Sequence, residues 1–289
     1  MWGFFPLYWP LLEPAGAVEI LAHRIVWSLI VMAGVVVALR RGSALRATLA
    51  DRRTRSLLAV AAVLITVNWG TYIWGVNHHH VVETSLGYFI NPLVSVLLGV
   101  LVLGERLRSL QWVALAIAAV AVLALTVEYG HPPWVALILA FSFGSYGLAK
   151  KKANAGAVES LVIETMVVSP VALGYIIFLM ATGASTFGNH GGGHVALIVG
   201  TGLITVLPLL CFGGAATRIP LSTLGLMQYL TPSVQFILGL VVFSEPMPAM
   251  RWVGFGLIWL ALALFTFETL RNRHRVRSTR DLESTQLAA

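Results

Sequence analysis

The chain has 289 residues, of which 58% are hydrophobic and only 11% are charged. A soluble domain carries about 25% charged residues, so this composition excludes a soluble globular protein of this size. The net charge of +7 would suit a nucleic-acid binder, but the basic residues lie between long apolar runs, which argues against that class. The single cysteine, Cys211, lies within an apolar run and excludes a disulfide framework or a cysteine-based metal site.

Nine apolar runs follow one another along the chain, and each is long enough to cross a bilayer. They lie at residues 17–39, 56–76, 83–104, 110–128, 133–149, 157–182, 195–216, 222–243 and 251–270. Residues 1–12 form a shorter apolar stub, which we interpret as part of a tenth span that has lost about eight to ten residues upstream. The sequence therefore predicts an all-α polytopic membrane protein with ten transmembrane helices, the first of them truncated.

Basic residues lie in every second linker, and only Arg24 and Arg251 among the 19 lysines and arginines depart from this pattern. Positive residues favour the cytoplasmic side of a membrane. With the stub counted as a span, the pattern places both the N-terminus and the C-terminus inside. The polar segment 271–289 is predicted to be a basic, disordered cytoplasmic tail.

The two halves of the chain repeat each other. The segment NPLVSVLLGVLVLGERLRSLQW begins at residue 91 and TPSVQFILGLVVFSEPMPAMRW at residue 231, so that Pro92 matches Pro232 and Glu105 matches Glu245. An odd number of helices in each half requires the second copy to enter the membrane from the opposite face. We therefore expect two inverted five-helix repeats at 1–128 and 133–270, a pattern typical of secondary transporters.

The same shift of 140 residues pairs Glu19 with Glu159 and Arg24 with Glu164. Arg24 and its neighbour His23 lie about 10 Å deep in one helix, and Glu164 lies equally deep from the opposite face. A charge at such depth normally faces the interior of the bundle or water. Arg24 is a candidate to attract a carboxylate or another anion, and Glu164 to bind a cation or a coupling proton. A direct ion pair between Arg24 and Glu164 would need strongly tilted helices, so we favour a position for each residue in its own half of one pathway. In the alternative interpretation, the Arg24 side chain snorkels outward and Glu164 braces a contact between helices.

Polar, aromatic and proline residues gather near the predicted midplane. Proline inside a helix frees the carbonyl four residues earlier, at Tyr88 for Pro92 and at Gln228 for Pro232. Aromatic walls with few polar groups suit a small amphipathic ligand. The alternative is a kink repaired by neighbouring helices. The remaining candidate site residues are Asn68, Trp69, Tyr72, Asn91 and Tyr229, with Pro208 as a third helix-breaking proline.

Several other polar groups are expected to have structural roles. His78, His79 and His80 follow one another in a loop and cannot all point the same way, so no metal site is expected there. Glu105 and Glu245 lie at helix ends, where local capping or pairing is expected. The sequence lacks a glycine loop that would cradle phosphate before a lysine, so we expect no nucleotide cofactor.

Longer motifs along nearly the whole chain resemble one transporter family. They are EILAHRIVWS (19–28), NWGTYIWGVNHHHVVETSLGYFINPL (68–93), LGERLRSLQW (103–112), FSFGSYGLAKK (141–151), LVIETM (161–166, Val162 apart) and TVLPLLCF (205–212). The chain resembles the RarD branch of the EamA-domain transporters, in the drug/metabolite transporter superfamily. The resemblance implies ten helices in two inverted repeats around a central cavity, in the cytoplasmic (inner) membrane of a bacterium. It also implies export of metabolites or drugs, and RarD members are named for chloramphenicol sensitivity.

The sequence favours a secondary transporter over two other classes, and the resemblance implies that it is an exporter. A channel is the first alternative, because aquaporin-type pores also use Asn-Pro in inverted repeats. A membrane-embedded enzyme is the second, but Glu164 is the one acid clearly at depth. The expected partners are a small-molecule substrate, the lipid bilayer and a coupling proton or ion, with no nucleic acid. The substrate, the coupling ion, the direction of transport and the oligomeric state stay open.

Overall fold

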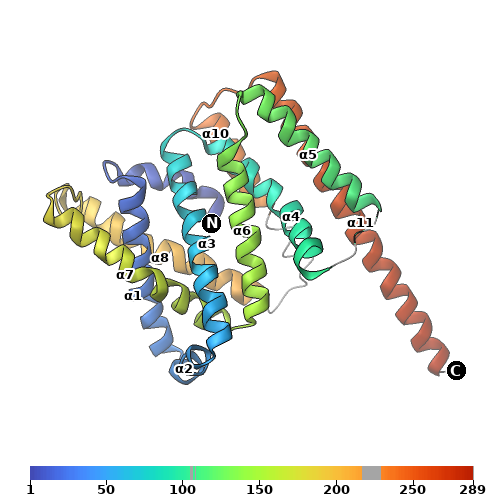
Figure 1. Ribbon diagram of the computed structural model, residues 1–289, viewed down its shortest axis with the longest axis horizontal. Coiled ribbons are helices and arrows are strands. Elements are labelled where there is room, and N and C mark those ends of the chain that lie inside the picture. Colours follow the sequence, from blue (N-terminus) through green and yellow to red (C-terminus); the bar gives the residue numbers. More distant parts are fainter. Residues whose placement is uncertain (105–106, 108, 217–228, 289) are drawn as a thin grey trace. The chain divides into compact units, whose positions relative to one another are not determined.

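The computed structural model describes residues 1–104, 107, 109–216 and 229–288 (Figure 1). Every regular element in these residues is a helix. In chain order they are η1 (Trp2–Leu7), η2 (Trp9–Leu12), α1 (Ala17–Ala38), α2 (Gly42–Ala50), α3 (Arg52–Asn77), α4 (Val81–Leu103), α5 (Ser109–Tyr129), α6 (Trp134–Ala153), α7 (Ala157–Ala181), α8 (Gly191–Ala216), α10 (Leu230–Val241) and α11 (Ala249–Ala288).

Seven of the described helices are long and apolar enough to cross a membrane, namely α1, α3, α4, α5, α7, α8 and α11. The helix α10 is apolar but has only 12 residues, and α6 carries three lysines in its last turn. The predicted all-α polytopic membrane fold is therefore confirmed. The count of ten helices and the inverted repeats stay predictions.

The two ends of the chain differ in local structure from the sequence-based expectation. The N-terminal stub forms two short 3₁₀ helices, because Pro6 and Pro10 lack an amide donor and disfavour the α conformation in the residue before them. At the other end, α11 continues through residues 271–288, for which a disordered tail is expected. No proline or glycine follows Gly256 to interrupt that helix.

The described chain forms two compact units. The first comprises Met1–Asn91 and Val135–Pro246, and the second Pro92–Trp134 and Met247–Ala289. Each unit thus combines segments from both predicted repeats, because helices from the two halves pack on each other. The helix bounds keep the spacing of the repeat: α1 and α7 begin at Ala17 and Ala157, 140 residues apart.

In the first unit, α1 packs against α7 and α8 (Figure 1). The contact between α1 and α8 is close because Gly202 has no side chain. A Cβ atom at Gly202 would lie 2.5 Å from the backbone carbonyl carbon of Trp27. Gly87 plays the same part in α4, where a Cβ atom would lie 2.8 Å from the carbonyl oxygen of Ala136 in α6. Small residues of this kind let membrane helices approach each other closely.

In the second unit, α5 and α11 lie side by side (Figure 1). Gly254 of α11 lies against Leu125 of α5, where an added Cβ atom would fall 2.5 Å from the Leu125 Cγ atom. Glu268, whose side chain is only 2% exposed, pairs with Arg271 at 2.6 Å. A buried acid in this unit therefore has a basic partner one helical turn away.

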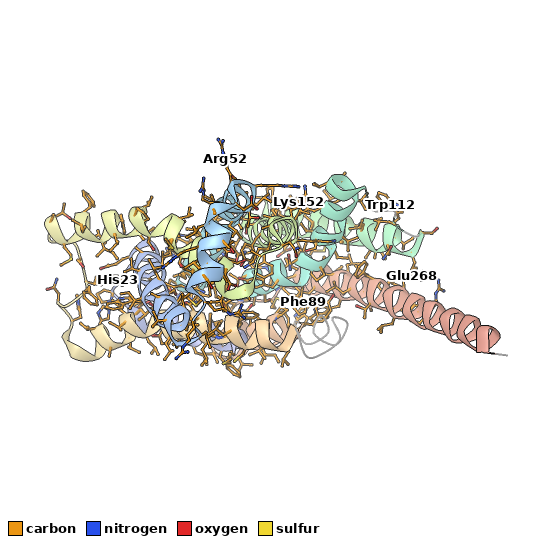
Figure 2. The ribbon with its side chains drawn as sticks, turned by 90° about the horizontal axis from the view of Figure 1, so that it is seen from below. His23, Arg52, Phe89, Trp112, Lys152 and Glu268 are labelled. Carbon is orange, nitrogen blue, oxygen red and sulfur yellow. The ribbon has the colours of Figure 1, made fainter. Side chains whose placement is uncertain are left out.

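Basic side chains of the first unit gather at one end of it, which we call the basic end. They come from the residues after α1, from α2, from the start of α3 and from the end of α6. Figure 2 shows Arg52 and Lys152 toward the same edge of the view. The start of α3 lies beside the end of α6, since the Thr54 hydroxyl is 3.4 Å from the Ala153 carbonyl oxygen.

Two buried glutamates cap helices that lie far from them in the sequence. The Glu245 carboxylate accepts hydrogen bonds from the backbone amides of Val81 and Val82, the latter at 2.8 Å, at the start of α4. Glu83 accepts from the amide of Val135 at 3.1 Å, at the start of α6. A carboxylate is favourable there because the first amides of a helix lack partners and carry partial positive charge. Glu245 thus caps a helix, as predicted, but a distant helix rather than a local one, and Glu105 lies outside the described residues.

Replacing Glu245 by alanine is expected to destabilise the protein by about 1–2 kcal/mol, because two amides at the start of α4 lose their acceptor. Thermal unfolding of the purified protein in detergent measures the effect. The exposed Glu13, replaced by alanine, is the control. Equal melting temperatures for the two variants would contradict the capping role.

Candidate functional site

The first unit holds a group of buried polar and aromatic side chains around Arg24, which we call the Arg24 cluster. Arg24 lies on α1 and is only 3% exposed. Its Nε atom donates a hydrogen bond of 2.7 Å to the Thr205 hydroxyl of α8. The guanidinium carbon lies 4.0 Å from the ring centroid of Trp69 and 5.2 Å from that of Trp9. The cation is thus held by aromatic faces and one hydroxyl.

Arg24 has no acidic partner among the residues that the structure describes. Its Nη1 atom is buried and lacks a hydrogen-bond partner within that part of the chain, and so does the Nε1 atom of Trp9. A buried charged donor without an acceptor is costly, and the cost is removed when an acceptor arrives. The Arg24 cluster therefore has an excess of donors, which is the chemistry of an oxyanion site.

Polar side chains of α3, α4 and α6 bond to one another beside this cation. Asn68 donates to the Leu139 carbonyl and to the Ser142 hydroxyl, both at 3.0 Å. The Tyr88 hydroxyl donates to the Asn68 side-chain oxygen at 3.2 Å. The Asn68 amide is thus locked in one orientation by partners on two other helices.

Tyr72 joins this network to Arg24. Its ring packs edge-to-face on Tyr88, with centroids 5.7 Å apart, and both hydroxyls lie within electrostatic reach of the Arg24 guanidinium. The Gln235 side chain of α10 donates to the Tyr72 hydroxyl at 2.9 Å. The buried side-chain oxygens of Gln235 and Asn91 have no hydrogen-bond partner among the described residues. With the Gln235 oxygen, the Arg24 cluster combines unused donors with an unused acceptor and aromatic walls, which suits a small amphipathic ligand.

Glu164 lies in a second buried polar group, at the basic end. Its carboxylate, 2% exposed, is 2.9 Å from the Lys150 ammonium, and it accepts a hydrogen bond of 3.1 Å from the Tyr146 hydroxyl. Both partners belong to α6. The direct pair of Arg24 with Glu164, disfavoured on depth, does not form, because each charge has nearer partners on other helices.

The other candidate residues occupy different positions. His23 is buried and its ring stacks on Phe187, 4.8 Å away, rather than on the Arg24 cluster. Tyr229 is the residue before α10, and Gln228 lies outside the described residues. His78 and His80 both stack on Trp74, with ring centroids 4.4 and 5.4 Å away, and His80 also pairs with Glu83 at 3.3 Å.

The predicted helix-breaking prolines do not end their helices. Pro92 lies inside α4 and Pro208 inside α8, and both helices continue past them. Pro232 lies in the first turn of α10, where no intrahelical bond to its nitrogen is lost. A single missing bond is tolerated because the rest of a long apolar helix keeps its own backbone pairs.

Several residues of these sites were not predicted from the sequence. Thr205, Trp9 and Gln235 reach the Arg24 cluster from segments far along the chain, and no local pattern marks them. Lys150 and Tyr146 are four residues apart, so they share one face of α6. That spacing was the available signal for the partners of Glu164.

The fold is that of a polytopic membrane protein, and the buried polar groups of the Arg24 cluster inside apolar helices are its candidate binding site. Residues 1–127 match the EamA-like transporter family. The chain is 58% identical to Protein RarD of Streptomyces exfoliatus, over 96% of this chain and 88% of the relative. It is 45% identical to the uncharacterized transporter YojE of Bacillus subtilis (strain 168), over 96% of this chain and 94% of the relative.

A solved crystal structure shares the fold, with a TM-score of 0.59 and 16% identity over 91% of this chain and 92% of that one. The identity to the two named relatives extends over nearly the whole chain. The chain therefore belongs to the EamA-like transporter family, as a RarD-type member.

Proposed function

We propose that this chain is a secondary carrier that exports small amphipathic metabolites or drugs bearing an oxyanion, by alternating access, across the cytoplasmic membrane of a bacterium. Both termini lie inside in this proposal. The observation that carries it is Arg24, a cation only 3% exposed whose Nη1 atom has no acceptor among the described residues. A carboxylate on the substrate supplies that acceptor.

The neighbours of Arg24 then have defined tasks. The Trp69 ring, 4.0 Å from the guanidinium, fixes its plane so that the free Nη1 edge faces the anion. The Trp9 indole nitrogen donates to the second oxygen. Tyr72 and Tyr88 provide aromatic walls. The side-chain oxygens of Gln235 and Asn91, which lack partners within the described part of the chain, accept from a hydroxyl, amide or ammonium group on the substrate.

The metabolites that accumulate in the medium of overexpressing cells test this function. The comparison is between the unchanged protein and Arg24→Gln at equal membrane levels. We expect a carboxylate-bearing compound to accumulate outside only with the unchanged protein. Accumulation of the same compound with both forms would remove Arg24 from the pathway, and an unchanged medium would contradict native-metabolite export.

Counterflow in proteoliposomes separates the carrier from a channel. The compound found in the medium, loaded inside, should accelerate entry of the same labelled compound from outside, because a carrier returns faster when loaded. A channel gives no such acceleration. An enzyme would instead convert the compound, which chromatography of the vesicle contents detects.

Glu164 is the proposed site of a coupling proton. Its partner Lys150 has a side chain that is 27% exposed and can leave the pair without breaking the fold. We expect Glu164→Gln to lose accumulation driven by a pH gradient while counterflow persists. Glu268→Gln is the matched control, since Glu268 is also 2% exposed and also pairs with a basic residue. Loss of both activities in Glu164→Gln would contradict a role confined to coupling.

A further inference from the structure

Two buried glutamates occupy corresponding places in the two halves of the chain. Glu19 lies in the first turn of α1 and Glu159 in the first turn of α7, and each is 4% exposed. They are 140 residues apart, as the sequence repeat requires. The N-cap residue is glycine in both helices and offers no side-chain cap. One oxygen of the Glu159 carboxylate lies against its own N-cap, where it would clash with a Cβ atom at Gly156. Each carboxylate also contacts the residues that follow the other helix.

At one end of the pair, Glu19 holds the loop between α7 and α8. Its carboxylate accepts hydrogen bonds from the Thr186 amide at 2.8 Å and from the Ser185 hydroxyl at 3.2 Å. The next loop residue, Phe187, stacks on the ring of His23. Phe187 also lies 6.4 Å, centroid to centroid, from Trp27 on α1, so the loop packs on α1 at two positions that flank Arg24 in the sequence.

At the other end, Glu159 holds the residues that follow α1. Its carboxylate lies 3.5 Å from the Arg41 guanidinium, and the Arg41 side chain is 56% exposed. This contact lies at the basic end of the first unit. On the same helix, Glu164 is paired with Lys150. The contacts at the second end are therefore ion pairs, whereas those at the first end are hydrogen bonds to a loop.

The two contacts lie on opposite ends of an antiparallel helix pair, because the start of each helix lies beside the residues after the end of the other. α1 has 22 residues. A helix of that length spans about 33 Å, close to the ~30 Å thickness of the hydrocarbon core. Arg24 lies between the two contacts along α1. A pathway through the Arg24 cluster thus meets one contact near each membrane face.

We propose that these contacts, which we call the Glu19 latch and the Glu159 latch, close the two ends of the substrate pathway and open one at a time. This inference rests on the proposed carrier function. A carboxylate in a latch is stable when it is bonded to its protein partners or to water. It is unstable when it is buried without either. Each latch therefore has two states, closed and dry or open and hydrated. Two repeat-related latches provide the two gates that alternating access needs.

Sided labelling of one reporter cysteine tests the latches without a known substrate. The reporter is Ser28→Cys in a Cys211→Ala background; Ser28 is fully buried on α1, between the latches. The probe is a membrane-impermeant, positively charged methanethiosulfonate, applied to right-side-out and to inverted vesicles. We expect Glu19→Ala to raise labelling about tenfold from the Glu19 face only, and Glu159→Ala from the basic face only, since one charged hydrogen bond shifts a two-state population by about that factor.

Partner variants and a control sharpen the result. Arg41→Gln should reproduce the effect of Glu159→Ala, and Ser185→Ala should give a weaker version of Glu19→Ala. Glu13→Ala, at an exposed position, should change labelling from neither face. If an alanine variant fails to fold, the glutamine variant replaces it, with a smaller effect expected on the same face.

Labelling raised from the same face by both glutamate variants, or raised by neither in folded protein, would overturn the latches. This outcome is distinct from failure of the proposed function. Sided labelling that follows the latches, together with no export and no counterflow, would leave the latches standing and refute the anion carrier. Transport together with labelling that is insensitive to both glutamates would refute the latches and leave the carrier standing.

Discussion

Replacing Arg24 by methionine is expected to weaken binding of an anionic ligand strongly while leaving the protein at least as stable as before. Methionine has a similar length and no charge, so it removes a buried cation that has no carboxylate partner among the described residues. Apolar replacement of a poorly compensated buried charge is often neutral or stabilising, and this offsets the lost bond to Thr205. Loss of one charged hydrogen bond to the ligand weakens binding by roughly 10- to 150-fold.

Fluorescence of the purified protein provides the measurement, because Trp69 and Trp9 lie beside the guanidinium. We use 4-hydroxybenzoate as the anionic probe and chloramphenicol as the neutral one. The anion should quench the fluorescence of the unchanged protein and not that of Arg24→Met, whereas Arg24→Lys should retain weak binding. Arg251→Gln removes the same charge elsewhere and is the control. Equal affinity of Arg24→Met and the unchanged protein for the anion would refute the oxyanion site.

Replacing Gly202 by alanine is expected to cause a large loss of stability from one added methyl group. The new Cβ atom would lie 2.5 Å from the carbonyl carbon and 2.6 Å from the carbonyl oxygen of Trp27, so α1 and α8 must move apart. Overpacking of this kind costs about 1–3 kcal/mol, and backbone atoms cannot move aside as a flexible side chain can. The same movement draws Thr205, three residues along α8, away from Arg24, so anion binding should weaken as well.

Gly174→Ala is the matched control, because Gly174 lies within the membrane helix α7 and nothing lies within 4 Å of its added Cβ atom. Alanine is the better helix former by about 1 kcal/mol, so this variant should be as stable as the unchanged protein or more so. Thermal unfolding in one detergent, with binding of 4-hydroxybenzoate, measures both effects. A melting temperature for Gly202→Ala as high as that of Gly174→Ala would contradict the close contact of α1 and α8.

The class of fold could be predicted from the sequence because it depends on local properties. A run of about 20 apolar residues must leave water whatever surrounds it, and a helix satisfies its own backbone inside lipid. The runs at 17–39 and 157–182 accordingly became α1 and α7 with only small changes at their ends. The N-terminal stub forms 3₁₀ helices instead, because Pro6 and Pro10 restrict the local backbone. The number of apolar residues in a segment does not reveal this restriction.

The candidate site could be predicted only in part. Arg24, Asn68, Tyr72 and Tyr88 stood out because polar groups inside apolar helices are costly and need a reason to be there. Their partners could not be found in this way. Thr205, Trp9 and Gln235 are ordinary residues in their own segments, and what distinguishes them is their contact with the others.

The sequence alone therefore determined that the chain crosses a membrane many times and that a few charges are buried, because both follow from the chemistry of each segment. Only the tertiary structure decided which charges are paired. Glu164 lies beside Lys150 and Arg24 beside aromatic rings because of how α6, α7, α1 and α3 pack. The pairing of these charges depends on close helix packing, such as that of Gly202 against Trp27. Such contacts join residues far apart in the sequence, so the local sequence does not reveal them.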